Sequence, residues 1–274
     1  MTLRVIDTLT ADNSEKYEVS IRLWPGGLSF SGYVLHEKDS FFTETFLFDS
    51  DQSMAQSLKN TFFDNQYFSY LYRSVSVLYV SGKYTLVPDS VFSEKDKSLL
   101  FSLCHQYNKK DTILVYPLKE LQSKILYTIE NEVYEFLVRS LVNPHIVHYL
   151  SPLLISWQKK SLTSYPKHIY VFIHDNILDI ACFEHGEMLF LNAFDYEKEN
   201  DIIYYILYTC RQLCINQLED NMYLCGDEMT CRSVMSVIKK YIKEVDYLPP
   251  RSDRYTVAAD KAMYYDLAAL MQCE

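Results

Sequence analysis

Apolar and polar residues alternate along short segments of the first 80 residues, a pattern that predicts β-strands with one buried face. In the segment 18–23, Val19, Ile21 and Leu23 alternate with polar neighbours. Further strands are predicted at 28–35, 41–48 and 75–80. Before the last of these, and after the polar run 49–51, apolar residues recur at helical spacing. They predict a helix that carries Met54, Leu58 and Phe62.

The same order of elements returns later in the chain. Strands are predicted at 169–174, 177–184, 188–194 and 222–224. A helix precedes the last of them, with an apolar stripe that begins at Ile202 and with Asn200 or Asp201 as its N-cap. The strand after the helix ends in glycine in both cases, at Gly82 and at Gly226. Each part therefore reads strand–strand–strand–helix–strand.

Three antiparallel strands followed by a crossover helix and another strand describe a ribonuclease H-like unit, and two such units in tandem describe the actin-like fold. We therefore predict an α/β protein made of duplicated ribonuclease H-like units. The first half is expected at 1–150, with additional α/β elements, and the second at 151–274. Because no low-complexity linker separates them, we expect the two halves to pack closely.

The additional elements are read from the same patterns. Ser93 and Asp96 look like a capping box in front of a helix that carries Leu99, Leu100 and Leu103. Strands are predicted at 112–116 and 124–128, and helices at 131–141, 151–160, 230–243 and 258–271.

Composition narrows the classes of function. The 274 residues carry a formal net charge of −10, whereas nucleic-acid binding usually leaves a basic footprint. We expect no nucleic-acid partner and no membrane insertion, since no stretch has the length and apolar content of a spanning helix. The seven cysteines are an odd number and fall mostly in apolar runs, which favours reduced thiols and a cytoplasmic protein.

Five short motifs carry a resemblance to known proteins that covers nearly the whole chain, roughly from Tyr17 to Met271. They resemble a bacterial family of uncharacterised proteins, with a domain of unknown function, whose structures have an actin-like ATPase fold. The resemblance carries no catalytic signature. The motifs are Val19-Ser-Ile-Arg-Leu23 with its Trp-Pro-Gly turn, Leu28-Ser-Phe-Ser31, Leu86-Val-Pro-Asp-Ser-Val-Phe92, Asn192-Ala-Phe-Asp-Tyr196 and Leu224-Cys-Gly-Asp-Glu228.

The resemblance implies where ATP and magnesium would bind: two Asp-x-Gly hairpins and a later Gly-Gly pair. This chain departs from that pattern at all three places. The first hairpin has glycines without an acid, the second an acid without a glycine, and the third one glycine followed by an acid. With only six glycines in the chain, phosphate-cradling loops are scarce. The residues at these places are Gly26, Gly27, Asp175, Asn176, Gly226 and Asp227.

Other sites are suggested only weakly. Asp175, Asp179 and Asp195 could form a nuclease-like metal cluster, but we interpret them as a turn former, a solvated strand residue and a helix-start acid. The pair Cys210 and Cys214 has a zinc-like spacing, yet it falls on the apolar stripe of a helix. We therefore predict no catalytic residues and no metal site.

The aromatic content is high, with 24 tyrosines and 15 phenylalanines, and it is densest between 62 and 72. Tyrosine is favoured at protein interfaces, although aromatic packing between the halves explains the run equally well. The candidate partner-binding residues are Tyr67, Phe68, Tyr70 and Tyr72.

Two functions remain open at this stage. The first is a non-hydrolysing actin-like scaffold that binds an unknown protein partner or itself and uses no cofactor. The second is a divergent nucleotide-binding ATPase or kinase, with ATP and magnesium held at the degenerate loops.

Overall fold

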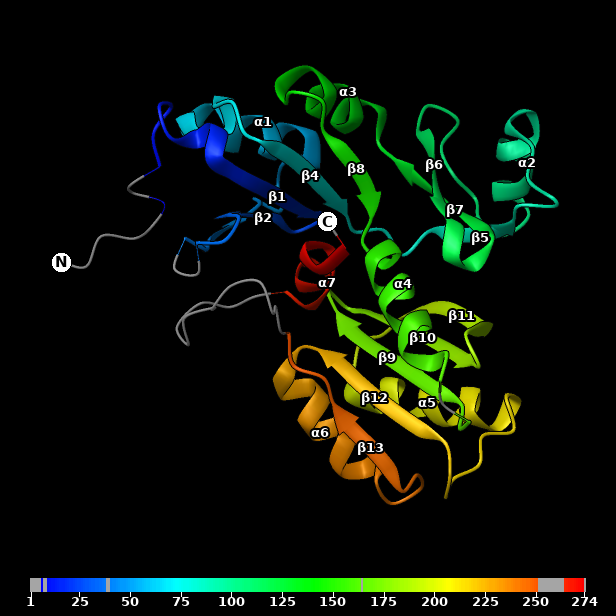
Figure 1. Ribbon diagram of the computed structural model, residues 1–274. Coiled ribbons are helices and arrows are strands. Elements are labelled where there is room, and N and C mark those ends of the chain that lie inside the picture. Colours follow the sequence, from blue (N-terminus) through cyan, green and yellow to red (C-terminus); the bar gives the residue numbers. More distant parts are fainter. Residues whose placement is uncertain (1–5, 7–8, 38–39, 164, 251–263, 274) are drawn as a thin grey trace.

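The computed structural model describes residues 6, 9–37, 40–163, 165–250 and 264–273. Two α/β halves, each built on a five-stranded sheet, lie one above the other in Figure 1. Each half is followed in the chain by one helix, the first by α4 (Leu150–Ser161) and the second by α7 (Tyr265–Cys273). These two helices pack against each other between the two sheets.

The first half has the sheet order β3-β2-β1-β4-β8, with α1 and α3 as its helices. Strands β1, β2 and β3 are antiparallel neighbours, whereas β4 and β8 run parallel to β1. The elements are β1 (Tyr17–Trp24), β2 (Gly27–Val34), β3 (Phe42–Leu47), α1 (Met54–Asp64), β4 (Ser74–Tyr79), α3 (Asn131–Ser140) and β8 (His145–His148).

The second half repeats this plan, with the sheet order β11-β10-β9-β12-β13. Its first three strands are antiparallel, and β12 and β13 run parallel to β9. The predicted duplication of a ribonuclease H-like unit is thus confirmed, and each sheet also has a fifth strand beyond the predicted four-strand unit. The elements are β9 (His168–His174), β10 (Ile177–Glu184), β11 (Glu187–Asp195), α5 (Glu199–Gln212), β12 (Asn221–Gly226), α6 (Glu228–Ile238) and β13 (Glu244–Tyr247).

A third sheet is inserted into the first half between β4 and α3. Its strand order is β5-β7-β6, all antiparallel, and with α2 it projects to the right of the first half in Figure 1. Within the described part of the chain, short 3₁₀ segments occur at 14–16, 66–69, 94–96 and 119–121. The inserted elements are β5 (Tyr84–Pro88), α2 (Lys97–Ser102), β6 (Thr112–Leu118) and β7 (Ser123–Ile129).

The core of the first half continues into the second through α4. Leu153, Leu154 and Trp157 of this helix are fully buried, and the Trp157 ring stacks on Tyr170 of β9 at 4.9 Å. Burying a large apolar side chain stabilises a fold by about 1.5–3 kcal/mol. The closely packed halves expected from the missing linker follow from this shared core.

Several element boundaries differ from the prediction. Helix α6 ends at Ile238, and the segment predicted as the end of that helix continues into the edge strand β13. Ser93 makes no side-chain cap, and a 3₁₀ turn stands where the capping box was expected. The helix predicted at 258–271 lies partly outside the described residues, and the described helix begins at Tyr265.

Gly226 allows a test of the close backbone packing between β12 and β9 in the second half. Its φ of +107° is left-handed, and a Cβ built there would lie 2.0 Å from the carbonyl oxygen of Ile173. We expect Gly226→Ala to lower the free energy of unfolding by at least about 2 kcal/mol, from backbone strain and this clash. Urea denaturation measures the change. Gly82→Ala is the matched control, because its Cβ would meet only Ile177 at 3.6 Å, and an equal loss in both variants would contradict this explanation.

Candidate functional site

The candidate site lies between the halves, where the first strand of each sheet ends in a hairpin. The β1–β2 hairpin turns at Pro25 and Gly26. The β9–β10 hairpin turns at Asp175 and Asn176, both left-handed with φ of 42° and 60°. Two consecutive left-handed residues make the type I′ turn that suits a tight hairpin, and Asn and Asp tolerate it well.

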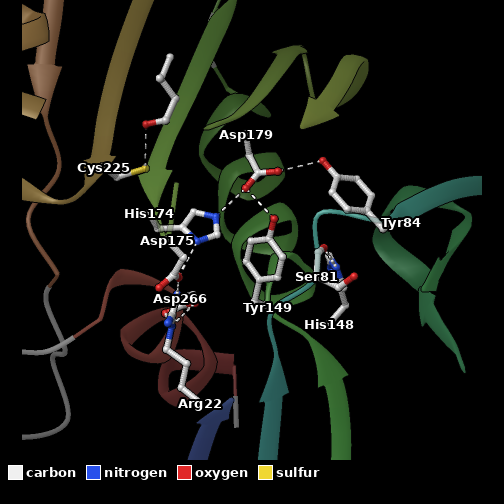
Figure 2. A network of polar contacts seen from close by, with 11 residues as sticks. Arg22, Ser81, Tyr84, His148, Tyr149, His174, Asp175, Asp179, Cys225 and Asp266 are labelled. Carbon is white, nitrogen blue, oxygen red and sulfur yellow. Dashed lines mark hydrogen bonds and ion pairs between the residues drawn. The ribbon is translucent and has the colours of Figure 1, made fainter. Parts of the chain in front are cut away.

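Arg22 of β1 is the central residue of the site (Figure 2). Its side chain is 0% exposed, and its Nη2 lies 2.5 Å from the carboxylate of Asp175 in the second half. Its Nε lies 3.0 and 2.7 Å from the two carboxylate oxygens of Asp266 on α7. The rings of Trp24 and Tyr264 lie 5.3 and 4.3 Å from the guanidinium carbon, and Nη1 has no hydrogen-bond partner among the described residues. One buried cation thus joins both halves and the last helix.

His174 extends this network through the second half. Its Nδ1 lies 2.9 Å from an Asp175 oxygen, and its Nε2 lies 2.9 Å from an Asp179 oxygen. Asp179 on β10 is fully buried and accepts two more hydrogen bonds, from the hydroxyls of Tyr149 at 2.7 Å and Tyr84 at 3.0 Å. Tyr84 belongs to the inserted sheet, so all three sheets meet in this network.

The protonation states follow from the geometry. Both nitrogens of His174 face carboxylate oxygens and donate to them, which requires the charged imidazolium. Burial disfavours that charge, but the hydrogen bonds to Asp175 and Asp179 outweigh it and raise the pKa of His174 above its ordinary value. Burial likewise acts to raise the pKa of Asp175, but its bonds from His174 and Arg22 hold it well below the usual range.

Burial and the neighbouring Asp179 raise the pKa of Tyr84 and Tyr149 far above the usual tyrosine value, so both hydroxyls remain donors. The network is therefore a chain of alternating charge. Asp266, Arg22, Asp175, His174 and Asp179 follow one another, and the two tyrosines close it. A buried cation with all its partners is tolerated, whereas removing one member leaves an uncompensated charge in a medium of low dielectric constant.

His148 is a second buried histidine beside this chain, and it behaves in the opposite way. Its Nε2 lies 2.9 Å from the carbonyl oxygen of Ser81 and donates to it. Burial lowers the pKa of His148 to about 3, so the ring is neutral. It packs among the rings of Tyr84, Tyr127 and Tyr149 and supports the network without charge.

The residues predicted to hold a nucleotide have other roles in the structure. A Cβ at Gly27 would lie 2.4 Å from the carbonyl oxygen of Phe46, so close strand packing explains that glycine. The same holds for Gly226 beside Ile173. The Asp227 carboxylate caps α6 by accepting from the backbone N–H of Thr230 at 2.9 Å.

Gly26 and Asn176 occupy turns, and the Asn176 carbonyl accepts from the backbone N–H of Tyr196 at 3.2 Å. The Asp175 carboxylate, the one acid suited to a magnesium ion, is already paired with Arg22 and His174. Two cationic side chains where a metal cation would sit are incompatible with its binding. As arranged, these residues do not fit a magnesium nucleotide.

The other weakly suggested sites were metal sites at the acidic residues and at the cysteine pair. Asp179 is buried in the network, so its interpretation as a solvated strand residue was wrong. The described residues contain no group of histidines, cysteines and acids that could hold a metal. Cys210 is half-buried and Cys214 exposed, and burial raises the pKa of the Cys210 thiol to about 12.

The aromatic run packs within the first half and not between the halves. Phe68 is 2% exposed and stacks on Phe62 at 4.3 Å, while Tyr67 stacks on Phe30 at 5.2 Å. Tyr72 donates to the carbonyl oxygen of Tyr67 at 2.5 Å. Tyr70 is half-buried against the same core. These contacts favour a packing role, and Phe68 has almost no surface to offer a partner.

Sequence reasoning found Asp175 but not Arg22, Tyr149 or Asp266. In β1, alternation assigned Arg22 to the polar face of a strand, although β1 is a central strand covered on both faces. A charged residue in an otherwise buried central strand was the available signal. Its partner Asp266 lies 244 positions away, beyond the reach of any local pattern.

Comparisons with known proteins agree with this architecture. The family model "Protein of unknown function (DUF3822)" matches residues 6–245, and the chain belongs to this family. A Bacteroides thetaiotaomicron VPI-5482 protein with an actin-like ATPase fold and unknown function is 28% identical, with a TM-score of 0.82 over 97% of this chain and 99% of that one. The fold is therefore that of the actin-like ATPases.

A second similar structure is the PilM–PilN type IV pilus biogenesis complex. It is 11% identical with a TM-score of 0.55, over 95% of this chain and 99% of that one, which shows the fold alone. A comparison with curated proteins finds no match. Among the helices that the structure describes, none has the length and apolar character of a membrane span.

Truncating the central cation tests the network. We expect Arg22→Ala to lower the free energy of unfolding by about 3–5 kcal/mol, because it leaves the carboxylate of Asp266 buried without a cation. Chemical denaturation monitored by circular dichroism measures the change. Arg232→Ala is the control, since its side chain is 59% exposed, pairs with Glu228 on the same helix and lies 5.6 Å from the ring of Tyr247. Equal losses of unfolding free energy in the two variants would contradict the role of Arg22 in joining the two halves and the last helix.

The charge on His174 predicts a pH dependence with a definite sign. Because its folded-state pKa is raised, its contribution is complete below about pH 6.5 and is lost as pH rises through the folded-state value. Urea unfolding between pH 5.5 and 9 should show the advantage of wild type over His174→Gln shrinking as pH rises. His145→Gln, at an exposed histidine outside the network, is the control. An advantage that grows with pH would contradict the charged imidazolium.

Proposed function

We propose that this protein is a non-hydrolysing scaffold of the actin-like ATPase fold, which acts by binding another protein. One observation carries the proposal: Arg22, fully buried, bridges Asp175 and Asp266 at the place where the fold would receive a nucleotide and its metal. The chain itself supplies the cation there.

The chemistry of phosphoryl transfer supports this reading. Such enzymes depend on a metal and on donors that are free to meet the phosphates. Here the acid that would hold the metal is already bound by Arg22 and His174, and close strand packing explains Gly27 and Gly226. Opening this site to a nucleotide requires breaking a buried ion pair, which costs several kcal/mol.

The relatives support a binding role only by analogy. One chain of the PilM–PilN type IV pilus biogenesis complex resembles this protein in fold. A chain of this fold can therefore serve as a partner for another protein. The proposal also places this protein in the cytoplasm, and the free cysteines of the described residues are in keeping with a reducing compartment.

Thermal unfolding with and without magnesium and ATP tests the proposal. A ligand that binds only the folded state raises Tm by mass action. At a ligand concentration of 100 times its Kd, the free energy of unfolding rises by about 2.7 kcal/mol. We expect no change in Tm at millimolar magnesium–ATP and no phosphate release above the rate without protein. Magnesium alone, and ATP with a chelator, are the controls. A saturable rise in Tm that needs both components would instead support the divergent ATPase or kinase.

A further inference from the structure

The first half carries a cavity of about 1000 Å³ at the end of its sheet opposite to Arg22. It opens at the amino ends of β1, β4 and β8, and its walls come from those strands, from the residues just after β2 and from the loops before β4 and β8. It is at the upper end of the size range of small-molecule sites. Nothing in the buried network between the halves accounts for it.

A step in the sheet forms the floor of this cavity. Strand β4 begins at Ser74, but β8 pairs with it only from Ser76, opposite His145. On that side, Ser74 and Val75 have no neighbouring strand among the described residues, and both line the cavity. An extended segment from another chain can pair with such an open edge, as in β-strand addition.

The polar groups around the step are mostly donors. Arg73 is 56% exposed, and its one ion pair joins Nε to Glu18 at a long 3.4 Å. The other Glu18 oxygen accepts from the Tyr33 hydroxyl at 2.6 Å, so the single acid of the cavity is already used. His36 and His145 stand exposed on the walls. With Glu18 already paired, the charge that the cavity offers to a ligand is the cation of Arg73.

Two backbone positions on the rim support a binding role. His36 and Asn143 are left-handed, with φ of 69° and 48°, and both line the cavity. Such strain in a non-glycine residue is uncommon and concentrates at functional positions. Apolar surface completes the lining, with Leu35 half-buried and Val142 58% exposed.

We propose that this cavity binds an extended acidic peptide segment of a partner protein, which adds beside β4 and places a carboxylate on Arg73. The inference rests on the proposed scaffold function and supplies its binding surface. The whole chain has a net charge of −10, so long-range attraction does not draw an acidic partner to it. Recognition depends on the local donors and on main-chain pairing.

A random peptide library displayed on phage, selected on the full-length protein, provides the probe. We expect selected sequences to contain Asp or Glu between alternating apolar residues, and the corresponding synthetic peptides to bind in fluorescence polarisation. Arg73→Glu should weaken them by about 10- to 100-fold, as expected for a charged hydrogen bond. Arg73→Gln, which keeps the length of the side chain, should weaken them in the same direction. The matched control is Arg232→Glu, with 59% exposure in the second half, which should leave binding unchanged.

Two more measurements separate the alternatives. Methylating alternate backbone nitrogens of the peptide should abolish binding, and unchanged binding would refute strand addition. Inorganic phosphate and acetate are tested alone: if they bind with the same dependence on Arg73 and no peptide does, the cavity is a small-anion site and the proposal is wrong. If no peptide binds and magnesium–ATP leaves Tm unchanged, only this site is refuted. If Tm rises with the nucleotide, the scaffold function itself is refuted.

Discussion

The buried guanidinium of Arg22 is the contact on which the arrangement of the two halves depends. It originates in the first sheet, reaches Asp175 in the hairpin of the second sheet, and holds Asp266 of the last helix. An arginine that is buried away from water must form ion pairs with carboxylates. That requirement fixes three distant segments to one point, and the apolar packing of α4 and α7 surrounds it.

This interaction also relates the fold to function. The two hairpins lie at the junction of the halves, and there Arg22, near the end of β1, pairs with Asp175 in the β9–β10 turn. The glycines that look like remnants of phosphate loops are kept by strand packing, as the close approaches at Gly27 and Gly226 show. The molecule thus retains the architecture of an ATPase while its own charges occupy the centre.

The fold could be predicted from the sequence because local patterns of apolar and polar residues recur in both halves. Alternation at Val19, Ile21 and Leu23, and the return of the same order of elements from 169 onwards, gave the succession of strands and helix along the chain in both halves. The site could be predicted only in part, since Asp175 marks a turn by its residue type. Arg22 was hidden because alternation cannot distinguish a solvent face from a face covered by a helix. The edge strand β13 was missed since its four residues follow a helix without a turn signal.

The most direct test of this account is a crystal structure grown with magnesium and a non-hydrolysable ATP analogue. We expect Arg22 to remain between Asp175 and Asp266, with no ordered triphosphate between the hairpins. A triphosphate bound through magnesium to Asp175, with Arg22 displaced from both carboxylates, would contradict it.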